Sequence, residues 1–282
     1  LFHFDNRRFV EDYAAEFRVE TPADRRLRVQ AGLYWYDQDR KNQQRSWPGP
    51  QVILGGASTD LQPPTFLDIT NQAVFGSIEW DFTDTLTLTV EGRYAEDTKG
   101  VRGGTLGTCD SFEGPDVCAP PEAELSFTAF TPRVTLRYRP TDDLTLYGLA
   151  ARGTKPGEFN TEFFRSGVRA AATIAGLEGC TPPENPNAPL LIRPCLPEPL
   201  AVVPEEEQWT YELGAKGVYF DGRLSANAAV YYIDWENQGV FSLVNILQDT
   251  GTYLTTTVIR AAGKSAVRGV ELETAFRGND RL

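Results

Sequence analysis

The residue types that usually carry catalysis or bind metals are scarce in this sequence. It contains one histidine, His3, and no methionine, so it lacks a well-placed base for a Ser or Cys triad and the ligands of a zinc site. No GxSxG, P-loop or HExxH motif is present. The acidic pair Glu271 and Glu273 is spaced for one face of a strand, which does not by itself make an acid–base pair. The sequence therefore indicates no enzyme and no resident cofactor.

The four cysteines are the remaining residues with distinctive chemistry. They lie at 109, 118, 180 and 195, and none belongs to a CxxC pair. Their spacing fits two local disulfides, Cys109–Cys118 and Cys180–Cys195, and hence an oxidising compartment. Free buried thiols are the alternative.

Charge and hydropathy restrict the partners and the location of the chain. The formal net charge of -12 argues against a nucleic-acid partner, which requires clustered Lys and Arg. No signal peptide precedes the first strand pattern, and no apolar run approaches the roughly 18 residues of a spanning helix. The chain is therefore soluble, or it meets a membrane as strands. The absence of Met, including a start Met, indicates a fragment.

Strict alternation of apolar and polar residues recurs along the chain and is typical of strands with two different faces. Val134, Leu136 and Tyr138 alternate with Arg133, Thr135 and Arg137, before a turn at 140–143. Similar units occupy residues 13–36, 73–97, 127–153, 207–235 and 265–277. This pattern predicts about nine strands of some 11–13 residues.

The connections between the predicted strands are of two kinds. Tight turns rich in Pro, Asp, Gly and Asn alternate with long segments at 38–70, 98–126, 155–206 and 236–264. Short turns at one end and long loops at the other are typical of outer-membrane barrels. The sequence therefore predicts an all-β fold: a segment of an antiparallel transmembrane β-barrel with short periplasmic turns and long extracellular loops.

Strand length and aromatic placement favour this barrel over a soluble sandwich, whose strands are usually 5–6 residues long. A strand of 11–13 residues exceeds the roughly 9–11 needed to cross a bilayer. Aromatic residues also gather near the predicted strand ends, as in interfacial girdles: Trp35, Trp80, Tyr138, Trp209, Tyr219 and Tyr232. Pro132 interrupts one strand pattern, and we expect a local bulge there.

Several stretches resemble one known family. AVFGSIEWDFTDTLTLTVEGRYAEDTK (73–99), TPRVTLRYRPTDDLTLYGLAARGTKPGEFN (131–160), YELGAKGVYFDGRLSANAAVYYIDW (211–235) and AGKSAVRGVELETAF (262–276) are similar to hairpins of the β-barrel of TonB-dependent outer-membrane receptors. The second resembles a family run ending in Ser-Arg-Gly-Phe-Lys-Pro-Gly-Gly-Phe-Asn. Ala151, Thr154 and Glu158 replace its Ser, Phe and one Gly, so substrate contacts there are expected to differ from those of relatives.

The resemblance implies a partial receptor barrel over residues 1–282, without the family's N-terminal plug and the barrel's terminal strands. The family barrel has 22 strands, so about nine would be a middle-to-late segment. The implied location is the outer membrane of a Gram-negative cell. The implied function is active uptake of a scarce, bulky nutrient: a ferric siderophore, haem, a cobalamin or an oligosaccharide. The partners would be outer-membrane lipid, a small-molecule or metal-chelate substrate and, through the missing plug, the TonB–ExbB–ExbD energy-transducing complex.

Candidate site residues follow from the two faces and the loops. The expected lumen-facing candidates are Glu91, Arg93, Arg133, Arg137, Glu212, Lys216 and Tyr231, which would line the transport path or simply solvate the lumen and pair with the plug. The loop aromatics that could stack on a ligand, or pack the loops together, are Trp47, Phe112, Phe159, Phe163 and Phe164.

Two further features concern metals. The lack of Met and of a well-placed His argues against capture of haem or copper by this segment. The acidic loop residues Asp110, Glu113, Asp116 and Glu205–Glu207 have the oxygen ligands that Ca²⁺ prefers, although solvated surface charge is the simpler interpretation.

Two other classes of protein remain open. A passive porin would share the barrel without a plug and would conduct ions as an open pore. A soluble carbohydrate-binding β-domain would stay monodisperse in water without detergent.

The predicted disulfides have a direct test. Non-reduced protein alkylated under denaturing conditions is expected to show no labelled thiol in its mass spectrum. Labelling of all four cysteines would contradict both bridges.

Overall fold

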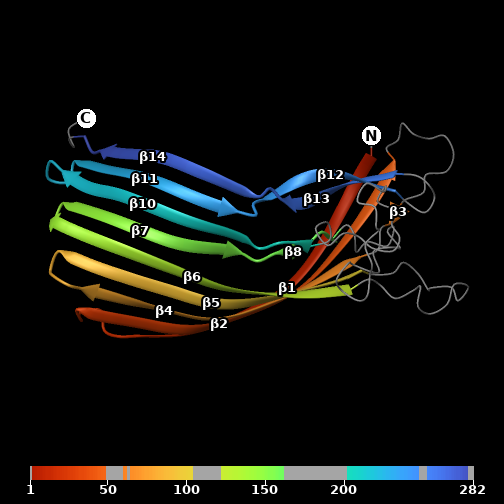
Figure 1. Ribbon diagram of the computed structural model, residues 1–282, viewed down its shortest axis with the longest axis horizontal. Helices are drawn as coiled ribbons and strands as arrows, with labels where there is room; N and C mark the ends of the chain where they lie inside the picture. Colours follow the sequence, from red (N-terminus) through yellow and green to blue (C-terminus); the bar gives the residue numbers. More distant parts are fainter. Residues whose placement is uncertain are drawn as a thin grey trace, which may run out of the picture.

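One antiparallel sheet organises the chain. The computed structural model describes residues 2–48, 60–61, 64–103, 122–161, 202–247 and 253–278. Nine long strands follow the order β1-β2-β4-β5-β6-β7-β10-β11-β14 (Figure 1). They are β1 (Phe2–Glu20), β2 (Leu27–Pro48), β4 (Thr65–Asp81), β5 (Leu86–Gly103), β6 (Glu122–Thr141), β7 (Leu144–Lys155), β10 (Glu206–Tyr219), β11 (Leu224–Glu236) and β14 (Lys264–Phe276).

Shorter strands cluster at one end of this sheet. β3 (Asp60–Leu61) pairs with β2, β8 (Glu158–Phe159) pairs with β9 (Val202–Val203), and β12 (Gly239–Leu247) forms a hairpin with β13 (Tyr253–Ala261). Figure 1 shows the tight turns at the opposite end. We call the end that carries the short strands the outer end. Within the described ranges, no helix is long and apolar enough to cross a membrane.

The nine predicted strands are confirmed, but several are longer than predicted. β7, β11 and β14 have 12 or 13 residues, whereas β2 has 22 and β6 has 20. In β2, β4, β5 and β6 the extra length lies at the outer end, within segments that the sequence analysis assigned to the loops 38–70 and 98–126. The predicted loop 236–264 instead contains the hairpin of β12 and β13. Backbone pairing does not depend on side-chain alternation, so the ladders continue after the apolar pattern has ended.

The two faces of the sheet differ in chemistry along most of its length. One face presents large apolar side chains that are exposed: Leu33, Val74, Ile78, Val90, Val134, Leu136, Leu213, Val230 and Leu272. The opposite face carries the charged partners that alternate with them. A soluble sheet buries its apolar face; here that face is free to contact lipid, as in membrane barrels.

Aromatic side chains flank the apolar face at both ends. Tyr138 pairs with Leu86 beside a tight turn, and Phe130 pairs with Tyr94 toward the outer end. The eight residue-to-residue steps from Tyr138 to Phe130 span about 26 Å along the strand, comparable with the roughly 25 Å apolar band of outer-membrane barrels before strand tilt is considered. Trp209, Tyr211 and Tyr232 extend the outer girdle, with ring centroids 6.1 and 6.4 Å apart.

The bulge predicted at Pro132 is wrong. The β5–β6 register runs through Gly92↔Pro132 without a shift. The register shift of this strand lies instead between Tyr138 and Thr141, next to the turn. On its other side, the β6–β7 ladder ends at Arg133↔Ala151, one residue from Pro132. A proline that coincides with the end of a ladder removes no bond from it, so the strand needs no bulge there.

The apolar face can be tested by one charge substitution. Val90 lies midway between the two girdles and is 41 % exposed. Val90→Arg is expected to destabilise the folded barrel by about 2–4 kcal/mol because it places a cation at the bilayer centre. The measurement is urea unfolding of the complete receptor in lipid vesicles.

The matched control is Gln30→Arg on the opposite face. Gln30 pairs with Ser77, at nearly the same depth as Val90, and lies beside the carboxylate of Glu20. This control is expected to leave the unfolding midpoint close to wild type. Equal destabilisation by the two substitutions would contradict the assignment of the faces.

Candidate functional site

The seven predicted lumen residues all lie on the polar face, where they make contacts between strands. Arg133 approaches Glu91 at 3.5 Å, and Arg137 approaches Glu79 at 3.8 Å. The Tyr147 hydroxyl donates to Glu212 at 2.6 Å. The remaining contacts are Arg93 to Asn71, Lys216 over the Tyr147 ring, and the Tyr231 ring against Gly269. These residues therefore tie neighbouring strands together on the polar face.

A further cluster on this face was missed by the sequence analysis. Arg28 of β2 binds Asp81 at 2.6 Å and also contacts Glu79, both on β4. Thr87 of β5 donates to Asp81 at 2.7 Å. Arg28 and Glu79 are register partners in the β2–β4 ladder. Aligning the two strand patterns in the sequence would therefore have placed these opposite charges side by side.

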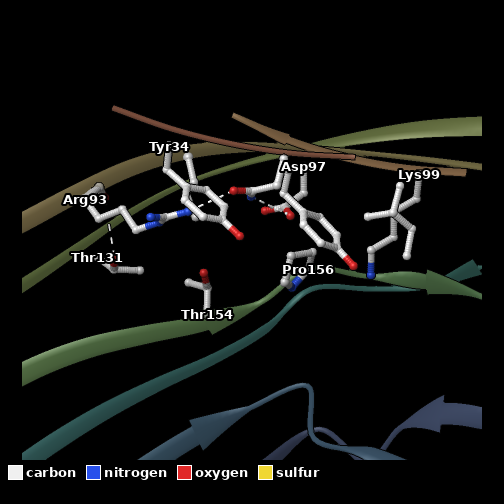
Figure 2. A pocket seen from close by; sticks show the side chains of 12 residues that line it. Tyr34, Arg93, Asp97, Lys99, Thr131, Thr154 and Pro156 are labelled. Carbon is white, nitrogen blue, oxygen red and sulfur yellow. Dashed lines mark hydrogen bonds between the residues drawn. The ribbon is translucent and has the colours of Figure 1, made fainter. Parts of the chain in front are cut away.

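Toward the outer end the polar face opens into a hollow of about 530 Å³, which we call the first hollow. Arg93 donates to Asn71 at 2.8 Å, and Asn71 donates to Asp97 at 2.7 Å. The Arg93 guanidinium also lies 4.9 Å from the centroid of the Tyr34 ring. Figure 2 shows Tyr34, Arg93 and Asp97 on one side of the hollow and Thr154 on the opposite side. The chain thus presents aromatic and hydrogen-bonding groups to one space.

A second hollow of about 430 Å³ lies next to the first, and the two share Ile69 and Lys99. Residues from β1, β2, β4, β5, β8, β12 and β13 line it: Arg8, Arg40, Asn42, Leu67, Ile69, Lys99, Gly100, Glu158, Phe159, Asn160, Thr161, Phe241, Thr257 and Ile259. Phe159, a predicted ligand contact, is 6 % exposed. It therefore contributes mainly as buried packing in the wall.

The segment from Arg152 to Asn160, which comprises the end of β7 and the residues after it, fixes the wall of these hollows by polar contacts. Arg152 donates to the carbonyl of Phe130 on β6 at 2.6 Å and binds Glu207 on β10 at 2.6 Å. Lys155 binds Glu206 at 2.8 Å. Glu206 is buried and also accepts a bond from Trp235 Nε1 at 3.1 Å. This segment therefore joins β6, β7, β10 and β11 at the outer end.

Two further residues of this segment, Gly157 and Asn160, lie in close contact with other strands. A Cβ at Gly157 would collide with the carbonyl oxygen of Val203 and the ring of Phe127, so a side chain has no space there. The Asn160 side chain donates to the carbonyl of Ile259 at 2.9 Å and accepts from its amide at 2.8 Å. Asn160 thereby pairs with β13 as a strand residue would and holds the β12–β13 hairpin.

Several predicted residues cannot be placed. The side chain of Trp47, together with Phe112, Phe163, Phe164 and the four cysteines, lies outside the described residues, as do Asp110, Glu113 and Asp116. Among the described acidic candidates, Glu206 and Glu207 are held by Lys155 and Arg152. Burial raises the pKa of Glu205. Within the described ranges, no group of three His, Cys, Asp or Glu residues is arranged to hold a metal ion.

An antiparallel sheet with an exposed apolar face, two aromatic girdles and a polar face hollowed at its outer end defines a segment of a transmembrane β-barrel. The family model of the TonB dependent receptor-like β-barrel matches residues 2–279. The chain therefore belongs to the TonB-dependent receptor family. Its members are transport proteins of the Gram-negative outer membrane, not enzymes.

Solved structures of large receptors share this fold. The ferric yersiniabactin uptake receptor FyuA from Yersinia pestis is 17 % identical with a TM-score of 0.65; the match covers 99 % of this chain and 34 % of that one. The ferric-catecholate import receptor Fiu from K12 E. coli is 15 % identical with a TM-score of 0.58, covering 98 % and 36 %. The copper transporter OprC is 13 % identical with a TM-score of 0.60, covering 98 % and 37 %. The chain thus spans about a third of the length of these relatives.

The role of Asn160 can be tested by Asn160→Ala. This substitution leaves the amide and the carbonyl of Ile259 without their partner, at a cost of about 1–3 kcal/mol for each buried group. Hydrogen exchange at the Ile259 amide in the folded receptor is expected to accelerate by about tenfold or more.

The control is Asn227→Ala, which removes a 3.3 Å side-chain bond to Glu273 on the exposed β11–β14 pair. It is expected to leave exchange at Ile259 unchanged. If Asn160→Ala also leaves that exchange unchanged, Asn160 does not hold the hairpin.

Proposed function

We propose that this chain is part of an energised outer-membrane receptor that takes up a scarce, bulky nutrient with energy from the TonB system. The match of the family model over residues 2–279 carries this proposal. Two of the similar structures are named as uptake or import receptors for iron complexes. A ferric siderophore is therefore the first candidate nutrient, ahead of cobalamin and an oligosaccharide.

The two halves of the polar face have different proposed roles. Near the turns, Arg28, Glu79 and Arg137 are occupied by one another, which suits a rigid wall. At the outer end, the two hollows carry aromatic, amide and cationic groups, which suit ligand capture. We place the first contact of the nutrient with this chain at the hollows and its later passage along the lumen-facing candidates.

The proposal is tested by uptake into whole cells. The complete receptor is expressed in a Gram-negative host that lacks its own nutrient receptors, and in the same host without TonB. Labelled ferric siderophores, cobalamin and oligosaccharides are supplied separately. At least one label is expected to accumulate in the first host and to fall to the receptor-free level in the second.

Accumulation that is equal with and without TonB would overturn active transport. Combined with a steady single-channel conductance in planar bilayers, that result would identify a passive pore. Vector-only cells provide the background for both hosts.

A further inference from the structure

The second hollow gathers cations without counter-ions. Arg8 of β1, Arg40 of β2 and Lys99 of β5 all line it. Within the part of the chain that the structure describes, none of the three forms an ion pair or a side-chain hydrogen bond. On the same face, Arg28 and Arg133 each have a carboxylate within 4 Å. Unpaired cations are unexpected in a chain whose net charge is -12.

The nearby carboxylate does not neutralise the three cations of the second hollow. Among the described residues that line the second hollow, Glu158 is the one carboxylate, and Lys155 already approaches it at 3.7 Å. Burial lowers the pKa of Lys99; the charges of Glu158 and Asp97 oppose this shift, and those of Lys155 and Arg40 add to it. Burial and the charge of Arg8 lower the pKa of Arg40 in the same way. The hollow therefore carries excess positive charge in a partly desolvated place.

Two polar atoms in this hollow lack partners among the residues that the structure describes. They are Arg40 Nε and Asn42 Oδ1, and both are buried. Buried donors and acceptors are nearly always satisfied, so each such atom calls for an explanation. Arg40 Nε requires an acceptor, and Asn42 Oδ1 requires a hydroxyl or N–H donor. A ligand that carries anionic oxygens together with hydroxyl or N–H groups would satisfy both.

We propose that the second hollow binds an anionic group of the transported nutrient, through Arg8, Arg40 and Lys99. The nutrient is then an anionic, oxygen-rich metal chelate, such as a catecholate or polycarboxylate complex, rather than a neutral cobalamin or oligosaccharide. Arginine suits this task because its planar fork binds carboxylate-like oxygens in pairs. This inference rests on the proposed function and specifies its substrate class.

The test measures equilibrium binding to the purified complete receptor in detergent, where no energy source is needed. The labelled probes are a trianionic ferric tricatecholate, ferric citrate, cyanocobalamin and maltoheptaose. Wild type is expected to bind at least one anionic chelate in preference to both neutral probes, with an affinity that falls as salt rises. Arg40→Gln and Lys99→Gln are each expected to weaken that binding by about 10- to 100-fold and to flatten its salt dependence.

Lys41→Gln is the matched control. Lys41 adjoins Arg40 in sequence, but its ammonium lies 5.8 Å from the centroid of the Phe66 ring and does not line the hollow. This variant loses the same charge and is expected to bind the chelate as wild type does. Heat-modifiable migration on gels verifies that each variant is assembled.

Three results would overturn the inference: preference for a neutral probe, no binding of either anionic chelate, or equal losses in Lys41→Gln and Arg40→Gln. The inference would also fail if the Arg40→Gln receptor kept its affinity for the chelate but became permeable to large antibiotics. In that case the cations would bind another part of the receptor and not the nutrient. TonB-dependent uptake of a neutral nutrient would leave the proposed function standing without this inference. Binding of the anionic chelate without TonB-dependent uptake would leave this inference standing without the proposed function.

Discussion

A backbone that lies in lipid has no water to satisfy its N–H and C=O groups, and the rest of this structure depends on that constraint. Each long strand between β1 and β14 is paired on both sides across the apolar band. β1 and β14 each have one edge without a partner in the described part of the chain. In a membrane those edges require further strands, which agrees with a chain that spans about a third of its structural relatives.

The constraint relaxes where the apolar band ends, and the sheet changes there. The β6–β7 ladder stops at Arg133↔Ala151, close to the outer girdle residue Phe130. Beyond that point the Arg152 guanidinium, instead of a strand backbone, satisfies the carbonyl of Phe130. The two strands no longer pair there, and the first hollow is lined by residues of β6, by Thr154 near the end of β7 and by Pro156, together with residues of β2, β4 and β5. The end of the lipid region therefore permits the opening that a ligand would use.

Sequence periodicity predicted the features of the fold that are determined by residues close together in the sequence. The alternation gave nine strands and their faces because each strand contacts lipid on one side and polar groups on the other. It did not predict the outer ends of β2 and β6, residues 38–48 and 122–126, which lie in segments assigned to loops. The contact between Asn160 and Ile259 joins residues 99 positions apart, and no local pattern encodes it. The convergence of Arg8, Arg40 and Lys99 likewise depends on register and curvature across β1, β2 and β5.

Residues 151–160 are of two kinds: some bind neighbouring strands, and others line the two hollows. Arg152, Lys155 and Asn160, which match the family run, bind β6, β10 and β13. Two of the residues that depart from the run have different positions: Thr154 lines the first hollow, and Glu158 lines the second. A receptor that changes its ligand while keeping its barrel must conserve the first kind of contact and vary the second. If the proposed function holds, these departures would mark where the chain adapts to its own nutrient, and the carboxylate of Glu158 would limit how much negative charge the second hollow accepts.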